Sequence, residues 1–81
     1  MGKTYAEELQ EKKAKFEKAL ETEMIMLESA KGQIKTLNEN PEELADPNYV
    51  IKVFEEAKEY RELVIEALQD KIDAIDKELR N

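Results

Sequence analysis

The sequence contains no cysteine and no histidine. Disulfides, thiolate metal sites and nucleophile pairs that use a His base are therefore excluded. Known carboxylate metal sites in helical bundles include a Glu-x-x-His motif, which this chain lacks. The acidic row from Glu55 to Glu66 therefore suggests a solvated face of a helix. We expect no enzymatic activity, no cofactor and no bound metal.

The chain is also poor in glycine and proline, with two of each among 81 residues, and it lacks a long apolar run. A membrane span needs about 18 apolar residues in succession, and a signal peptide needs an apolar core behind its charged start. Neither is present. These absences predict a soluble, cytoplasmic protein that forms one domain over residues 1–81 and does not contact membranes.

Charge is abundant: 41% of the residues are charged and 41% are hydrophobic. The apolar residues recur at helical spacing, which predicts long helices. The first should begin near residue 4 at the capping box Thr4-x-x-Glu7 and end near residue 38. Its apolar positions alternate three and four residues apart, as in a heptad seam. This first seam consists of Ala6, Leu9, Lys13, Phe16, Leu20, Glu23, Leu27, Ala30, Ile34 and Leu37.

The segment NENPEELADPNY, residues 38–49, interrupts the periodicity. Asn40-Pro41 and Asp46-Pro47 each place a capping residue before a proline, which suits the first position of a helix. We expect a connection over residues 39–46 and a second helix over residues 47–80. The second seam consists of Ile51, Phe54, Lys58, Arg61, Ile65, Leu68, Ile72, Ile75 and Leu79.

Two helices of equal length with a short connection predict an all-α, antiparallel, coiled-coil-like hairpin, roughly 50 Å long. Residues whose numbers add to about 87 should lie opposite one another. Glu23 and Arg61, one in each seam, would then form a polar pair that fixes the register at some cost in stability. The same register places a lysine run opposite three aspartates, and we expect these charges to help align the helices. The residues concerned are Lys12, Lys13, Lys15 and Lys18, and Asp70, Asp73 and Asp76.

Apolar residues exceed what two helices can bury. Four follow one another from Met24 to Leu27, and a stripe beside the second seam contains Val50, Val53, Ala57, Tyr60, Val64, Ala67 and Ala74. A broad apolar face in which methionine fills gaps is one interpretation. Because the chain has no further helix to cover this surface, we predict a homodimer in which two hairpins form a four-helix bundle. The expected interface consists of Met24, Ile25, Met26, Val53, Tyr60, Leu63 and Val64.

The net charge of −7 resides in the connection and the second helix, because residues 1–38 contain seven lysines and seven acidic residues. This balance argues against direct binding of nucleic acid or anionic lipid. The connection combines acids with apolar residues, which could recognise a basic partner or could simply close the end of the core. The residues of this candidate tip site are Glu39, Glu42, Glu43, Leu44, Asp46 and Tyr49.

Two functions are compatible with these features. The first is a protein–protein interaction module, an oligomeric adaptor, chaperone or scaffold that binds an unidentified protein through its helical faces. The second is a small acidic inhibitor, of the kind encoded by phages or mobile elements, that occupies a basic groove on its target. Added salt should weaken charge-driven groove binding steeply and apolar helix docking only slightly.

Overall fold

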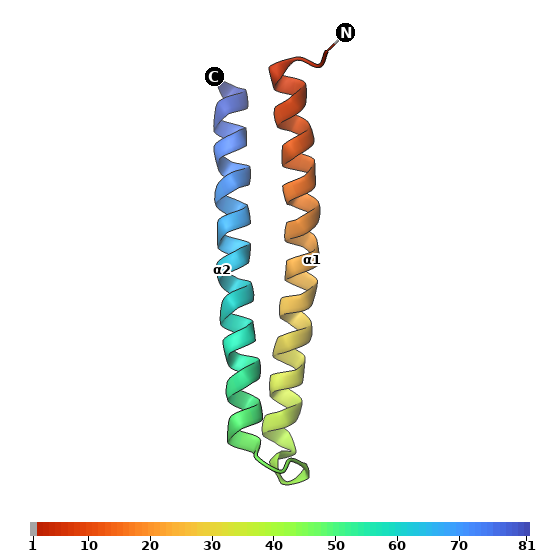
Figure 1. Cartoon of the computed structure of the whole chain (residues 1–81), viewed down its shortest axis with the longest axis vertical. Helices are drawn as coiled ribbons and strands as arrows, with labels where there is room; N and C mark the ends of the chain where they lie inside the picture. The colour runs from red at the N-terminus through yellow and green to blue at the C-terminus, as the bar shows by residue number, and fades with distance from the viewer. Residues whose placement is uncertain (1) are drawn as a thin grey trace.

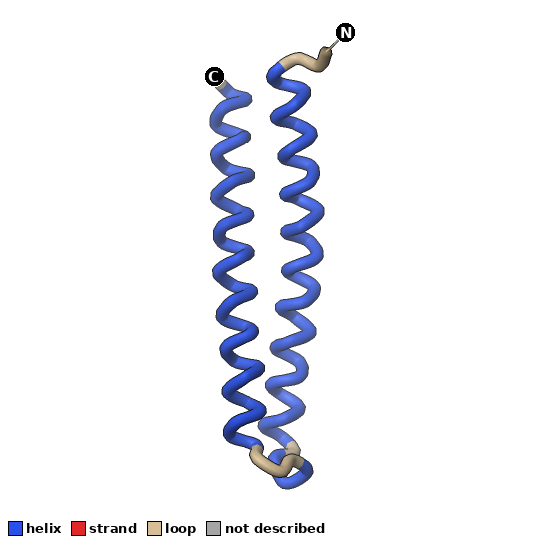
Figure 2. Tube along the Cα trace, viewed as in Figure 1, coloured by secondary structure: helices blue, strands red, loops and turns tan. Residues whose placement is uncertain are grey.

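The computed structural model describes residues 2–81 and consists of two long antiparallel helices (Figures 1 and 2). Helix α1 spans Tyr5–Glu39, the 3-10 turn η1 spans Pro41–Glu43, and helix α2 spans Pro47–Arg80. No strand occurs in this part of the chain. The molecule is a rod with extents of 62 × 20 × 14 Å. The predicted all-α helical hairpin is confirmed.

The ends of the helices follow the predicted capping signals. The Thr4 hydroxyl accepts a hydrogen bond from the Glu7 amide at 3.2 Å, and the Asp46 carboxylate accepts one from the Tyr49 amide, also at 3.2 Å. Both bonds satisfy amides that have no partner within their helix. Pro47 occupies the first turn of α2, where its missing amide proton is not needed.

The helices pack along the two predicted seams. Every seam residue except the exposed Ala6 is half-buried or buried. Among the described residues only Ile72 and Ile75 are fully buried, with 5% and 8% of their surface exposed. Both lie in the half of α2 that is distant from the connection (Figure 1). Two helices therefore leave most of their apolar seam partly open to solvent.

Contacts near the open end of the hairpin agree with the expected register to within about one helical turn. The Tyr5 hydroxyl donates a hydrogen bond to Glu78 at 3.2 Å, and Lys13 Nζ lies 2.6 Å from Asp76 Oδ1. Within residues 2–81, Lys13 is the one member of the predicted lysine run that forms an ion pair across the hairpin. Ordering long exposed side chains costs entropy, so the remaining lysines stay solvated.

Tyr5 and Lys13 hold their protons more tightly in the folded hairpin. Repulsion between a phenolate and Glu78, together with the hydrogen bond to Glu78, raises the pKa of Tyr5 above 10.0. The hydrogen bond to Asp76 raises the pKa of Lys13 above 10.5. A raised folded pKa stabilises the fold below the ordinary pKa, and this contribution disappears as the pH rises through the folded pKa.

We therefore expect the free energy of unfolding to fall as the pH rises above about 10. The fall should be shallower in Tyr5→Phe, which cannot form a phenolate, and in Glu78→Gln, which removes the repelling carboxylate. Urea unfolding followed by circular dichroism, at several values between about pH 8 and about pH 11.5, measures the slopes. An equally steep fall in all three proteins would contradict the assignment to Tyr5.

A second prediction concerns Gly32, which lies inside α1 with open space where a Cβ atom would stand. Glycine in a helix interior costs about 0.5–1 kcal/mol relative to alanine. Gly32→Ala should therefore raise the free energy of unfolding by about that amount, and Ala14→Gly should lower it similarly. Urea unfolding of both variants provides the measurement. A loss of stability in Gly32→Ala would show that another chain packs closely against this position.

Candidate interaction surfaces

One broad side of the hairpin carries no charged residue along its middle. A groove on this side is lined by Met26, Ser29, Ala30 and Gln33 of α1 and by Phe54, Ala57 and the seam residue Arg61 of α2, so these residues border one side. Positions three, four or seven residues along a helix lie on the same face. The uncharged face defined in this way contains Ala19, Thr22, Met26, Ser29, Gln33 and Thr36 on α1, and Val50, Val53, Ala57, Tyr60, Val64 and Ala67 on α2.

Several large side chains on the uncharged face are open to solvent. Met26 is 41% exposed, Val53 46% and Tyr60 64%. Phe54, a seam residue, lines the groove beside Met26 and also a second groove with Gln33 toward the tip. The face is thus incompletely filled where the hairpin approaches its connection, and it presents apolar and small polar groups that a further helix could cover.

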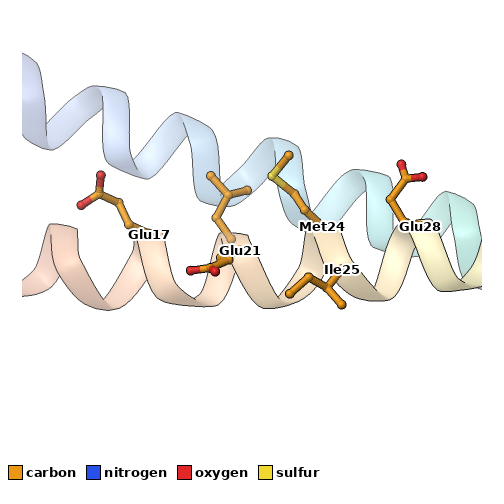
Figure 3. Close-up of a pocket in the computed structure, with 6 residues that line it drawn as sticks. Glu17, Glu21, Met24, Ile25 and Glu28 are labelled. Atoms are coloured by element: carbon orange, nitrogen blue, oxygen red, sulfur yellow. The ribbon is translucent and has the colours of Figure 1, made fainter.

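The opposite side carries a third groove, which we call the α1 groove. It is lined by Glu17, Leu20, Glu21, Met24, Ile25 and Glu28. Figure 3 shows Met24 and Ile25 projecting from α1, with Glu17 and Glu21 before them and Glu28 after them. Met24 is 53% exposed and Ile25 is 64% exposed. This groove thus has an apolar floor and a rim of carboxylates.

The same side of α2 is acidic. Asp76, which pairs with Lys13, lies on this side of α2. Glu62 is two heptads before Asp76 and therefore lies on the same side. Helical spacing places three more glutamates beside Glu62. The acidic face therefore comprises Glu17, Glu21 and Glu28 on α1 and Glu55, Glu59, Glu62 and Glu66 on α2. Lys31, Lys35 and Lys52 occupy the same heptad positions, so this side carries charges of both signs with an excess of carboxylates.

The structure distributes the seven predicted interface residues over different surfaces. Consecutive residues of an α-helix point about 100° apart, so the run from Met24 to Leu27 encircles α1. Leu27 enters the seam, while Met24 and Ile25 line the α1 groove. Leu63, 65% exposed, projects from α2 away from the seam. The uncharged face brings together the remaining four, Met26, Val53, Tyr60 and Val64.

Glu23 and Arg61 meet across the hairpin at the middle of the two seams. Arg61 Nη1 donates to Glu23 Oε2 at 2.7 Å, and their side chains are 29% and 19% exposed, respectively. A charged hydrogen bond this short within a mostly apolar seam favours one register over a slipped one. Throughout residues 2–81, no buried side-chain nitrogen or oxygen lacks a hydrogen-bond partner.

At the tip, Tyr49 is the one candidate residue with a large, exposed apolar ring. Asp46 accepts the Tyr49 amide as the cap of α2, and Leu44 is half-buried behind η1. Tyr49 is 66% exposed. Glu39 ends α1, while Glu42 and Glu43 lie in η1. Of the candidate tip residues, Tyr49 is thus the largest apolar group open to a partner, and one of the four acids is already engaged as a cap.

Other kinds of site find no support in the described part of the chain. Residues 2–81 contain no group of three or more Asp, Glu, His or Cys side chains arranged to hold a metal ion. None of the helices over the same residues has the length and apolar character required to cross a bilayer. Protein-family models give no match to this chain, and neither the curated proteins nor the solved structures contain a significant match.

Sequence reasoning missed the α1 half of the uncharged face, apart from Met26. Its residues are mostly small or polar, including Ala19, Thr22, Ser29 and Gln33, so a search for apolar stripes passes over them. The available signal was the absence of charge at heptad spacing in a chain that is 41% charged. Recognising it requires knowing which flank of α1 lies beside Ala57.

A prediction concerns the Glu23–Arg61 pair. Changing either residue alone to leucine leaves the other charge unpaired in a partly buried seam. Changing both leaves no charge at this position. Urea unfolding of the single and double variants should give a coupling energy of about 1–2 kcal/mol. The exposed pair Lys3–Glu11, with side chains 56% and 52% exposed, is the control and should couple by less than about 1 kcal/mol. Additive effects at Glu23 and Arg61 would refute this role.

Proposed function

We propose that this protein is a non-enzymatic protein–protein interaction module whose hairpins pair through their uncharged faces. The observation that carries the proposal is the uncharged face itself, whose positions on both helices hold no charged side chain. Arg61, which lines the groove on this side, is paired with Glu23 in the seam. Charged residues keep helical surfaces in solution, so a side from which they are missing over several turns suits contact with protein.

Charge favours a second copy as the occupant of this face. Each chain has a net charge of −7, so copies repel wherever acidic surfaces approach. On the uncharged face no like charges oppose one another when two copies meet. A twofold axis through the middle of the face would bring Tyr60 and Val64 of each copy near those of the other, forming an isologous four-helix bundle.

The size of the face is adequate for a modest interface. From Ala19 to Thr36 a helix rises about 26 Å. With a rod width of 20 Å, two copies together would bury roughly 1,000 Å², near the lower limit for specific association. A second copy would also fill the grooves beside Phe54. We therefore expect reversible dimerisation rather than a permanent assembly.

Such a dimer suits an adaptor, chaperone or scaffold. Pairing through the uncharged faces leaves both acidic faces outward, where each can engage another protein.

The acidic face supports a second candidate function. Seven glutamates on one side of a rod could fill a basic groove on a target and inhibit it, because complementary charge steers association. Salt distinguishes the two functions. Occupancy through charge alone should weaken steeply as salt rises toward about 1 M, where the Debye length shortens to about 3 Å, whereas docking through apolar contact should not.

Self-association is tested with two variants, each of which replaces one glutamine by glutamate. Gln33 lies on the uncharged face, whereas Gln10 lies seven residues before Glu17 on the acidic side. Gln33→Glu should weaken dimerisation at least about tenfold, because it brings unpaired charges into the contact. Gln10→Glu adds the same charge elsewhere and should change the dissociation constant less than about twofold. Sedimentation equilibrium gives the constants, and circular dichroism checks helicity.

A wild-type protein that remains monomeric at about 0.5 mM would contradict self-association. Equal weakening by both substitutions would mean that net charge, and not the uncharged face, controls assembly.

A further inference from the structure

The α1 groove remains uncovered in the proposed dimer, because it lies on the side of α1 away from Met26 and Gln33. Met24 and Ile25 are more than half exposed there. Neither side chain contributes to the seam or to the uncharged face. A partner other than a second copy is needed to bury them, because two acidic faces would repel each other.

We propose that the α1 groove binds a basic amphipathic helix of a partner protein. The apolar side of that helix would cover Leu20, Met24 and Ile25, and its lysines or arginines would reach the carboxylates of Glu17, Glu21 and Glu28. This inference rests on the proposed role as an interaction module, but it does not depend on dimerisation.

Charge complementarity identifies the occupant. The groove is lined by three carboxylates and by no basic residue. Lys31 Nζ lies 3.4 Å from Glu28, whereas Glu17 and Glu21 form no ion pair among the described residues. Glu59, Glu62 and Glu66 on the same side of α2 strengthen the negative potential. A basic segment is attracted to such a surface, and an acidic one is repelled.

The dimensions of the groove suit a short helix. From Glu17 to Glu28, α1 rises about 16 Å, which equals three turns of a partner helix. Over three turns an amphipathic helix presents apolar residues at spacings of three and four, enough to cover Leu20, Met24 and Ile25. Methionine adapts its shape to different apolar side chains, so Met24 suits a surface that accepts more than one sequence.

The test uses a synthetic helical peptide of about 18 residues with leucine on one face and lysine on the other. A peptide of the same pattern with glutamate in place of lysine is its control. Isothermal titration calorimetry with the full chain should show the Leu/Lys peptide binding with a micromolar dissociation constant. The Leu/Glu peptide should bind at least about a hundredfold more weakly.

Matched variants separate the groove from general attraction to an acidic protein. Replacing Glu17, Glu21 and Glu28 together by Gln should weaken binding of the Leu/Lys peptide at least about tenfold. Replacing Glu39, Glu42 and Glu43 together by Gln removes the same charge from the tip and should weaken it less than about threefold. A larger effect at the tip would overturn the proposal and place docking at the connection.

The apolar part of the groove has its own control. Ile25 and Leu63 are equally exposed, at 64% and 65%, but only Ile25 lines the groove. Ile25→Ala should weaken binding of the Leu/Lys peptide about fivefold, and Leu63→Ala should weaken it less than about twofold. Equal effects of the two substitutions would overturn the proposal. Circular dichroism of each variant confirms that the hairpin is intact.

The outcomes also separate this inference from the proposed function. If the wild-type chain dimerises but fails to bind the Leu/Lys peptide, the groove proposal fails and self-association through the uncharged face stands. If a monomeric chain binds the peptide and the groove variants weaken binding as expected, the dimer proposal fails and the groove assignment stands.

Discussion

The contact between α1 and α2 along one stripe of each helix is the interaction on which the rest of this structure depends. Each helix offers the other a narrow seam, and a helix in contact with a single neighbour cannot bury more than that seam. Even along the seam, only Ile72 and Ile75 are fully buried among residues 2–81. The remaining surface is therefore divided into two broad sides, one on each flank of the seam.

Charge gives these two sides different properties. The heptad positions on one flank hold Met26, Ser29 and Gln33 beside Ala57, whereas those on the other flank hold glutamates around Met24. In an antiparallel pair of helices, the same flanking heptad positions of both helices lie on one side of the hairpin. Uncharged positions on each helix therefore combine into one side, and acidic positions into the other. A molecule with a net charge of −7 thereby keeps the middle of one side free of charged side chains, while the other side carries an excess of carboxylates.

Much of the fold follows from the sequence because its signals are local. Thr4 and Asp46 cap helices through bonds to amides three residues away, and the heptad spacing identifies the seams without knowledge of the partner helix. Two helices of nearly equal length joined by a short connection then fix the register, which is why Glu23 and Arg61 could be paired in advance.

The surfaces were harder to predict, because they depend on which side of the hairpin each helical position faces. Met24, Ile25 and Met26 are adjacent in sequence, yet Met26 lines the groove beside Ala57 while the other two line the α1 groove. Counting apolar residues merges these neighbours into one patch. The same count leaves out Thr22 and Ser29, because they are polar. They belong to the uncharged face only because they carry no charge.

The position of the two buried isoleucines bears on how the chain folds. Ile72 and Ile75 lie far from the connection, whereas the nearer half of the hairpin contains the unfilled grooves around Phe54. If the contacts around Ile72 and Ile75 form first, a large loop must be closed. If the helices instead pair from the connection outward, the first contacts form in the half that contains the unfilled grooves. In the folded state, amide hydrogens beside the connection should exchange with solvent sooner than those around Ile72.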